Sequence, residues 1–302
     1  MKNFKVTLPV IIGIAIVLFG AILISFSPKG KADAAHFFNL QQRVSSVNLN
    51  KAFYFADEEV PINEDTYERL DRELSVNAYW QSSTLLQLKL AHKYFPEVER
   101  ILKNQGIPDD FKYLAVAESG LRNPTSSSGA KGYWQFMKPT AKELNLEISA
   151  DVDERLHLEK STMAACTYIK QLYNRFGNWT NAAGAYNIGP TAFAKAVDEQ
   201  KESSYYMLNV NDETSRYVFR IVAFKEILSN PNNFGYYIEN FEKYMPHTQM
   251  KEIEVTSTIE SLADFAHANG TSYRLLKYYN PWLINSRLTV PVGKTYRIKI
   301  PA

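Results

Sequence analysis

The chain has 302 residues, of which 45% are hydrophobic, 13% aromatic and 22% charged, a composition typical of a globular protein that excludes wholesale disorder. The 34 Lys and Arg residues against 32 Asp and Glu residues give a net charge of +2, which excludes a broad basic surface for nucleic acid. The single cysteine excludes an intramolecular disulfide and a cysteine-based zinc site, and the five histidines lack the spacing of a helical metal site.

An uncharged run of 19 residues stands near the N-terminus, from Leu8 to Phe26. A helix needs about 20 apolar residues to cross a bilayer core, and Lys2 and Lys5 before the run favour an N-terminus on the inner side. A cleaved signal peptide would have a shorter apolar core and a small-residue cleavage site just after it. We therefore predict a retained transmembrane signal-anchor over residues 1–27, with cleavage as the alternative.

Helical patterns dominate the middle of the chain. Residues 28–79 are expected to form a stalk, Asn- and Ser-rich to about residue 62, and then an N-terminal helical extension. Apolar spacing and end signals are helical from about residue 63 to residue 230, and we expect the main domain to cover residues 80–235. Its expected helices cover residues 84–94, a second helix opened by Pro96, a third capped by Asp109, residues 160–176 and residues 212–229. Residues 236–250 are expected to be a linker.

The C-terminal residues 251–302 have a different pattern. Residues 252–256 and 296–300 alternate in the manner of short strands. Two short helical patterns lie between them, at residues 259–268 and 272–279. We therefore predict a small βααβ module after a mainly α body.

One carboxylate lies on an apolar helix face. Phe111, Leu114, Ala115 and Glu118 occupy positions i, i+3, i+4 and i+7, which share one face of a helix. A carboxyl group in such a place is desolvated, which raises its pKa and suits a general acid near neutral pH. From spacing alone, Glu118 could equally pair with an Arg or Lys, or turn outward at the end of its helix.

A polar loop and an aromatic run follow this helix. Residues 126–132 could offer hydroxyl donors to a polar ligand, and residues 133–137 place aromatic rings around one amide, Gln135. Aromatic faces with a few polar groups suit sugar rings, although the same run could be ordinary core.

Four motifs in this order resemble the lytic transglycosylase domain, a lysozyme-like, all-helical family that cleaves peptidoglycan. They are Glu118-Ser119, residues 132–137 (GYWQFM), residues 185–189 (AYNIG) and residues 213–218 (ETSRYV). The resemblance implies that Glu118 is the single catalytic acid. It further implies that the substrate is bound by Ser128, Gln135, Met137, Tyr186, Asn187, Glu213 and Tyr217. Ile188 and Tyr133 depart mildly from the family pattern.

The C-terminal module resembles a LysM domain, which binds glycans that contain N-acetylglucosamine. The matching parts include residues 261–266, Gly270-Thr271, Asn280-Pro281 and residues 292–294. The usual opening G-D-T is absent, because Thr256-Ser257-Thr258 stands in its place. The resemblance thus implies the fold, while glycan binding competes with a purely structural cap.

Together these resemblances imply a peptidoglycan lytic transglycosylase. It would cleave the β-1,4 bond between N-acetylmuramic acid and N-acetylglucosamine, form a 1,6-anhydromuramoyl product in cell-wall remodelling, and need no metal or cofactor. The alternatives are a hydrolytic muramidase similar to goose-type lysozyme and a non-catalytic glycan-binding scaffold. The expected partners are peptidoglycan glycan strands and the membrane that holds the anchor, with the body in the periplasm and the inner membrane favoured over the outer.

Overall fold

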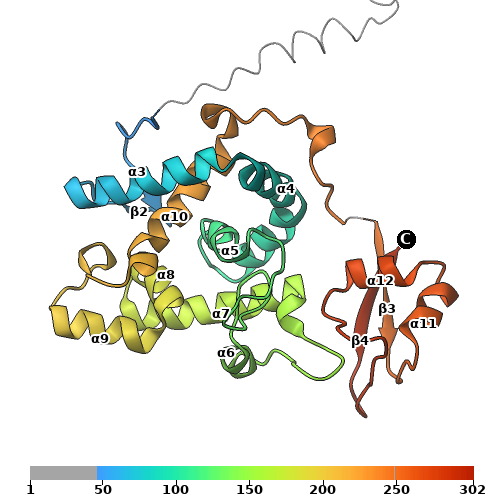
Figure 1. Ribbon diagram of the computed structural model, residues 1–302. Helices are drawn as coiled ribbons and strands as arrows, with labels where there is room; N and C mark the ends of the chain where they lie inside the picture. The colour runs from blue at the N-terminus through green and yellow to red at the C-terminus, as the bar shows by residue number, and fades with distance from the viewer. Residues whose placement is uncertain (1–45, 248) are drawn as a thin grey trace, which may run out of the picture. The chain divides into compact units, whose positions relative to one another are not determined.

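The computed structural model describes residues 46–247 and 249–302 (Figure 1). Its helices are α3 (Glu64–Tyr79), α4 (Gln81–Asn104), α5 (Phe111–Ser119), α6 (Lys138–Glu143), α7 (Leu158–Phe176), α8 (Trp179–Ile188), α9 (Pro190–Gln200), α10 (Asp212–Ser229), α11 (Leu262–Ala268) and α12 (Tyr273–Tyr279). Its strands are β1 (Tyr54–Phe55), β2 (Glu58–Glu59), β3 (Met250–Val255) and β4 (Tyr296–Pro301), and four short 3-10 helices complete it: η1 (Glu154–Leu156), η2 (Tyr205–Met207), η3 (Pro231–Phe234) and η4 (Asn240–Glu242). The mainly helical architecture is confirmed.

The predicted membrane anchor, residues 1–27, lies outside the described residues. Within the part of the chain that the structure describes, no helix combines the length and the apolar character that a membrane span requires.

Helix α5 is the buried centre of the helical body, with α4, α7, α8 and α10 around it (Figure 1). Every residue of α5 from Phe111 to Val116 is buried. Most of these residues are apolar, and their burial in the core stabilises the helix, while Lys112 is paired with Glu99 and Asp109. The helix ends at Gly120, whose φ of 57° is the left-handed conformation that glycine adopts without a Cβ clash. This end places Glu118 one residue before the helix stops.

Helix α4 corrects the prediction that a new helix opens at Pro96. The helix runs without a break from Gln81 to Asn104, with Pro96 in its interior. Proline removes one backbone hydrogen bond, which costs about 3 kcal/mol. The buried side chains lie on both sides of it, among them Leu88, Ala91, Val98 and Leu102. Their continuous burial offsets that loss, so the helix continues through the proline.

The predicted cap of α5 is also wrong. Asp110, not Asp109, precedes the helix, and it makes no capping hydrogen bond. Its carboxylate accepts instead from the backbone N–H of Ala56 at 2.7 Å and from Lys225 at 2.7 Å. Asp109 pairs with Lys112. These tertiary partners compete successfully with the local helix N-terminus.

Residues 47–62 do not form the predicted stalk, whereas the predicted N-terminal helical extension corresponds to α3. Residues 54–59 form a two-stranded antiparallel hairpin, and Phe53 and Phe55 are buried in the main hydrophobic core. The Glu58 carboxylate accepts from the backbone N–H groups of Trp179 and Thr180 at 2.7 and 2.8 Å. An acid at a helix N-terminus satisfies otherwise unpaired donors. This segment therefore belongs to the helical body.

The C-terminal βααβ prediction is confirmed. Strands β3 and β4 pair antiparallel, from Met250 opposite Pro301 to Val255 opposite Tyr296. Ser261 and Ser272 cap α11 and α12 by accepting from the backbone three residues on. The module has a hydrophobic cluster of its own. The expected linker before it is mostly exposed, although Tyr236 at its start is buried and donates to the Ala78 carbonyl at 2.6 Å.

Candidate active site

Glu118 lies half-buried in the last turn of α5 and accepts a hydrogen bond from the Tyr217 hydroxyl of α10. The partner is thus a neutral hydroxyl rather than the Arg or Lys that an ordinary ion pair would supply. The side chain also stays against the core instead of turning outward at the helix end. The two structural alternatives that the sequence left open are therefore not what the structure shows.

Burial raises the pKa of Glu118 from 4.5 to about 7, because the charged carboxylate is desolvated. The Tyr217 hydrogen bond favours the charged form and lowers this pKa. The negative charge of Glu213 raises it, and the positive charge of Arg220 lowers it. A carboxyl group with a pKa near neutral can both give and take a proton at physiological pH.

A second tyrosine completes the apolar surroundings of Glu118. Tyr186 of α8 donates to the Trp134 carbonyl at 2.7 Å, and its ring centroid lies 5.4 Å from that of Tyr168 and 6.1 Å from that of Phe136. Burial, with the nearby Glu118 charge as a second cause, raises the pKa of Tyr186 well above 10. Tyr186 therefore remains protonated.

Helix α10 presents one face to this region. Glu213, Tyr217 and Arg220 are spaced i, i+4 and i+7, and all three act on the Glu118 carboxyl. Tyr217 is buried, while Glu213 in the first turn is exposed. Thr214 donates to the Asn187 side chain at 2.7 Å, which joins the AYNIG segment to the same helix. The structure thus brings together predicted residues from three segments distant in sequence.

The other predicted residues lie on the loop between α5 and α6. Ser128 is exposed, and its hydroxyl lies 2.9 Å from that of Ser126. Gln135 has a left-handed backbone (φ 49°), and its amide donates to the carbonyls of Pro124 and Gly132 at 3.1 and 2.8 Å. Met137 is 43% exposed at the start of α6. These side chains shape a loop surface and make their contacts within the loop.

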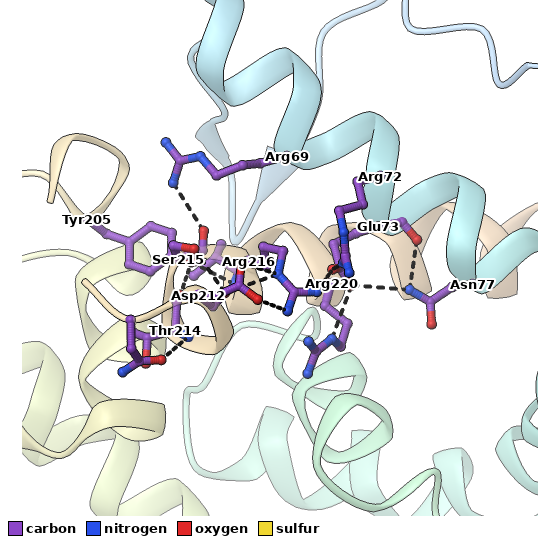
Figure 2. A network of polar contacts seen from close by, with 12 residues as sticks. Arg69, Arg72, Glu73, Asn77, Tyr205, Asp212, Thr214, Ser215, Arg216 and Arg220 are labelled. Carbon is purple, nitrogen blue, oxygen red and sulfur yellow. Dashed lines mark hydrogen bonds and ion pairs between the residues drawn. The ribbon is translucent and has the colours of Figure 1, made fainter. Parts of the chain in front are cut away.

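A buried ion-pair network beside the site was not foreseen from the sequence (Figure 2). Glu73 of α3 is 2% exposed and accepts from Arg72, Arg216 and Arg220 at 2.8, 2.9 and 3.1 Å. Leu70, Glu73, Leu74 and Asn77 occupy one helix face, the same pattern that singled out Glu118. That spacing could have predicted the buried carboxylate. Two of its three partners, Arg216 and Arg220, lie 143 and 147 residues away and have no local sequence pattern that indicates the contact.

Among the described residues, no group of three or more His, Cys, Asp or Glu side chains could hold a metal ion.

Two family models match the chain. Residues 98–209 match the Transglycosylase SLT domain, and residues 251–302 match the soluble lytic transglycosylase C-terminal LysM-like domain. The chain therefore carries an SLT transglycosylase domain, which includes Glu118, followed by a LysM-like C-terminal domain. The resemblance drawn from the sequence motifs is confirmed.

The chain is similar to curated proteins and to a solved structure. The chain is similar to the membrane-bound lytic murein transglycosylase D of Escherichia coli (strain K12) and to its counterpart in Escherichia coli O6:H1, each 26% identical over 235 residues. The alignments cover 76% of this chain and 50% of each relative, so the chain spans about half the length of these curated relatives. It is also similar to the solved structure of an inactive mutant of lytic transglycosylase Slt from Pseudomonas aeruginosa, with a TM-score of 0.36 and 20% identity, over 50% of this chain and 26% of that chain.

Proposed function

We propose that the protein is a peptidoglycan lytic transglycosylase that cleaves the β-1,4 bond between N-acetylmuramic acid and N-acetylglucosamine. The observation that carries the proposal is the state of Glu118, which lies within the SLT domain. Its carboxyl group is desolvated, its pKa is raised to about 7, and it accepts a hydrogen bond from the Tyr217 hydroxyl. The names of the curated relatives, lytic murein transglycosylases, support the same reaction class.

In the proposed mechanism, protonated Glu118 gives its proton to the glycosidic oxygen as the bond to the muramoyl C1 breaks. The Glu118 carboxylate then takes the proton of the muramoyl 6-hydroxyl, whose oxygen forms the new bond to C1. The product is a 1,6-anhydromuramoyl sugar, no water is consumed, and Glu118 is protonated again. The Tyr217 hydroxyl stabilises the carboxylate between the two steps, because a hydrogen bond to the charged form favours it.

The remaining assignments belong to the same proposal. The exposed Ser128 and Met137, with Gln135, would bind the sugars from the loop side, and Asn187 and Glu213 from the side of α8 and α10. The proposed catalytic domain covers residues 80–235 and the glycan-binding module residues 251–302. Residues 1–27 would anchor the protein in a membrane, and an uncleaved anchor favours the inner membrane over the outer. The body would then lie in the periplasm.

Product analysis tests the reaction. We expect purified protein and murein to give 1,6-anhydromuramoyl fragments by mass spectrometry. Fragments heavier by one water would instead identify a hydrolytic muramidase, in which Glu118 protonates the leaving group and water attacks. Binding of murein without any released fragment would identify a non-catalytic scaffold.

Charge substitutions on α10 should shift the pH dependence in opposite directions. Glu213 raises and Arg220 lowers the pKa of Glu118. The first step needs a protonated acid, so kcat/KM should fall as the pH rises through the pKa of Glu118. This fall should begin at a lower pH in Glu213→Gln than in wild type, and at a higher pH in Arg220→Gln. Lys195→Gln, an exposed change on α9, should leave the profile unchanged. Shifts of the same sign in both α10 variants would contradict the assignment.

A further inference from the structure

A short buried segment, residues 151–156, lies between α6 and α7 and contacts two parts of the molecule at once. We call it the bracing segment. It includes η1, and its residues 151–155 are buried. One side contacts the loop of residues 123–137, which carries the proposed sugar-binding Ser128 and Gln135. The other side contacts the LysM-like domain.

On the loop side, Arg155 supplies most of the contacts. Its side chain is 5% exposed, and its Nη1 donates to the carbonyls of Gly129 and Phe136, each at 3.1 Å. The loop also approaches the backbone of the bracing segment. A Cβ added at Gly132 would lie 1.9 Å from the Arg155 carbonyl oxygen, and Asn123 donates to the Leu156 carbonyl at 3.1 Å. The loop is therefore closely fitted to this segment at both of its ends.

Asp153 fixes the orientation of Arg155. The carboxylate, 2% exposed, accepts from Nε at 2.9 Å and from Nη2 at 2.8 Å. This two-point geometry sets the plane of a guanidinium group and is not reproduced by lysine. Nε, Nη1 and Nη2 all donate to partners within the protein. The Arg155 guanidinium therefore stabilises the fold and does not face a ligand.

On the other side, the bracing segment extends the fold of the LysM-like domain. The Asp153 N–H donates to the Trp282 carbonyl at 2.9 Å, and Val152 pairs with Leu283 and is buried in the hydrophobic cluster of that domain. The Asp151 carboxylate accepts from the Asn285 amide at 2.8 Å and from the Thr289 N–H at 2.9 Å.

We propose that Arg155 is a positioning residue for the sugar-binding loop, and that the LysM-like domain stabilises this loop through the bracing segment. The domain is then part of the architecture of the binding site, beyond any glycan contact of its own. The expected effect of Arg155 on murein binding rests on the proposed function. The expected effect of Arg155 and the LysM-like domain on loop stability does not depend on catalysis.

Hydrogen exchange in the full chain tests the loop side. Arg155→Lys keeps the charge but cannot hold Asp153 and both carbonyls together. We expect the hydrogen-bonded amides of Gly129, Ala130 and Lys131 to exchange about tenfold faster, with α7 amides unchanged as the control for folding. The KM for murein should rise about tenfold while kcat changes less than twofold. Unchanged loop exchange would overturn the role of Arg155.

A second variant tests the contribution of the LysM-like domain. Asp151→Asn places an amide opposite Asn285 and weakens the contact, and it should accelerate exchange of the same loop amides, by less than Arg155→Lys does. Glu254→Gln removes an exposed ion pair of the same domain with Arg297 and serves as the matched control. Unchanged loop exchange in Asp151→Asn would overturn the domain's part of the proposal. Faster exchange in both variants of a protein that releases no murein fragment would support the brace and refute the proposed enzyme.

Discussion

Glu118→Gln should lower the rate of murein cleavage by about 10²–10⁴-fold, the usual contribution of a general acid–base group. Glutamine has nearly the shape of a protonated glutamic acid and can still accept the Tyr217 hydrogen bond, so the fold should be retained. Release of anhydromuramoyl fragments by the variant and by wild type measures the effect. Glu199→Gln, an exposed glutamate on α9, is the matched control and should keep full activity.

The same substitution should also stabilise the protein, in a pH-dependent way. Below pH 4.5 the Glu118 carboxyl is protonated in the folded and the unfolded chain. Between pH 4.5 and about 7 only the unfolded chain releases the proton, because the folded pKa is raised to about 7. Wild type therefore loses up to about 3 kcal/mol of stability over this window, at about 1.4 kcal/mol per pKa unit.

Glu118→Gln has no such loss. Its free energy of unfolding should exceed that of wild type by up to about 3 kcal/mol at pH 8 and match it at pH 4. Urea unfolding at the two pH values measures the difference. Full cleavage activity in the variant would refute catalysis by Glu118 and favour a glycan-binding scaffold. A loss of stability at pH 8 would show that the carboxyl group has a structural role instead.

The sequence was informative wherever the relevant forces act within one helix. The face that holds Glu118 follows from a spacing of 3 and 4 residues, and the ends of α5 and α7 follow from Gly120 and Gly177, both in the left-handed conformation. The hydrogen-bond partner of Glu118, in contrast, does not follow from the spacing of residues within one helix. Tyr217 lies 99 residues away, so its approach depends on how α10 packs on α5, which no local pattern contains.

The wrong predictions have the same origin. Pro96 and Asp109 give strong local signals for a helix start, and tertiary contacts override both. Phe53 and Phe55 stand in a polar stretch that reads as a stalk, yet both are buried because the hairpin packs on the helical core. Local preferences are worth about 1 kcal/mol or less, except for proline at about 3. Burial of one large apolar side chain contributes about 2 kcal/mol. This exceeds the local preference at Phe53 and Phe55, and the several side chains buried on both sides of Pro96 together exceed the cost of the proline.

Glu73→Gln should destabilise the protein by about 3 kcal/mol, the largest stability loss we expect from one change near the site. Glu73 is 2% exposed and accepts from three arginines, of which Arg216 keeps a second partner in Asp212 (Figure 2). Within the part of the chain that the structure describes, Arg220 forms an ion pair with Glu73 and with no other acid, and its side chain is only 22% exposed. Removing one partner of a buried pair leaves the other charge uncompensated, which typically costs 3–5 kcal/mol when burial is complete.

Urea unfolding measures this loss, with Glu68→Gln on the exposed side of α3 as the control, which should stay within about 0.5 kcal/mol of wild type. The loss should persist in about 1 M salt, because a buried pair is weakly screened. The double variant Glu73→Gln/Arg220→Gln should recover part of the stability, since it removes the charge that the single change leaves unpaired. A double variant no more stable than Glu73→Gln would show that the loss comes from packing of the Glu73 side chain and not from the unpaired arginine.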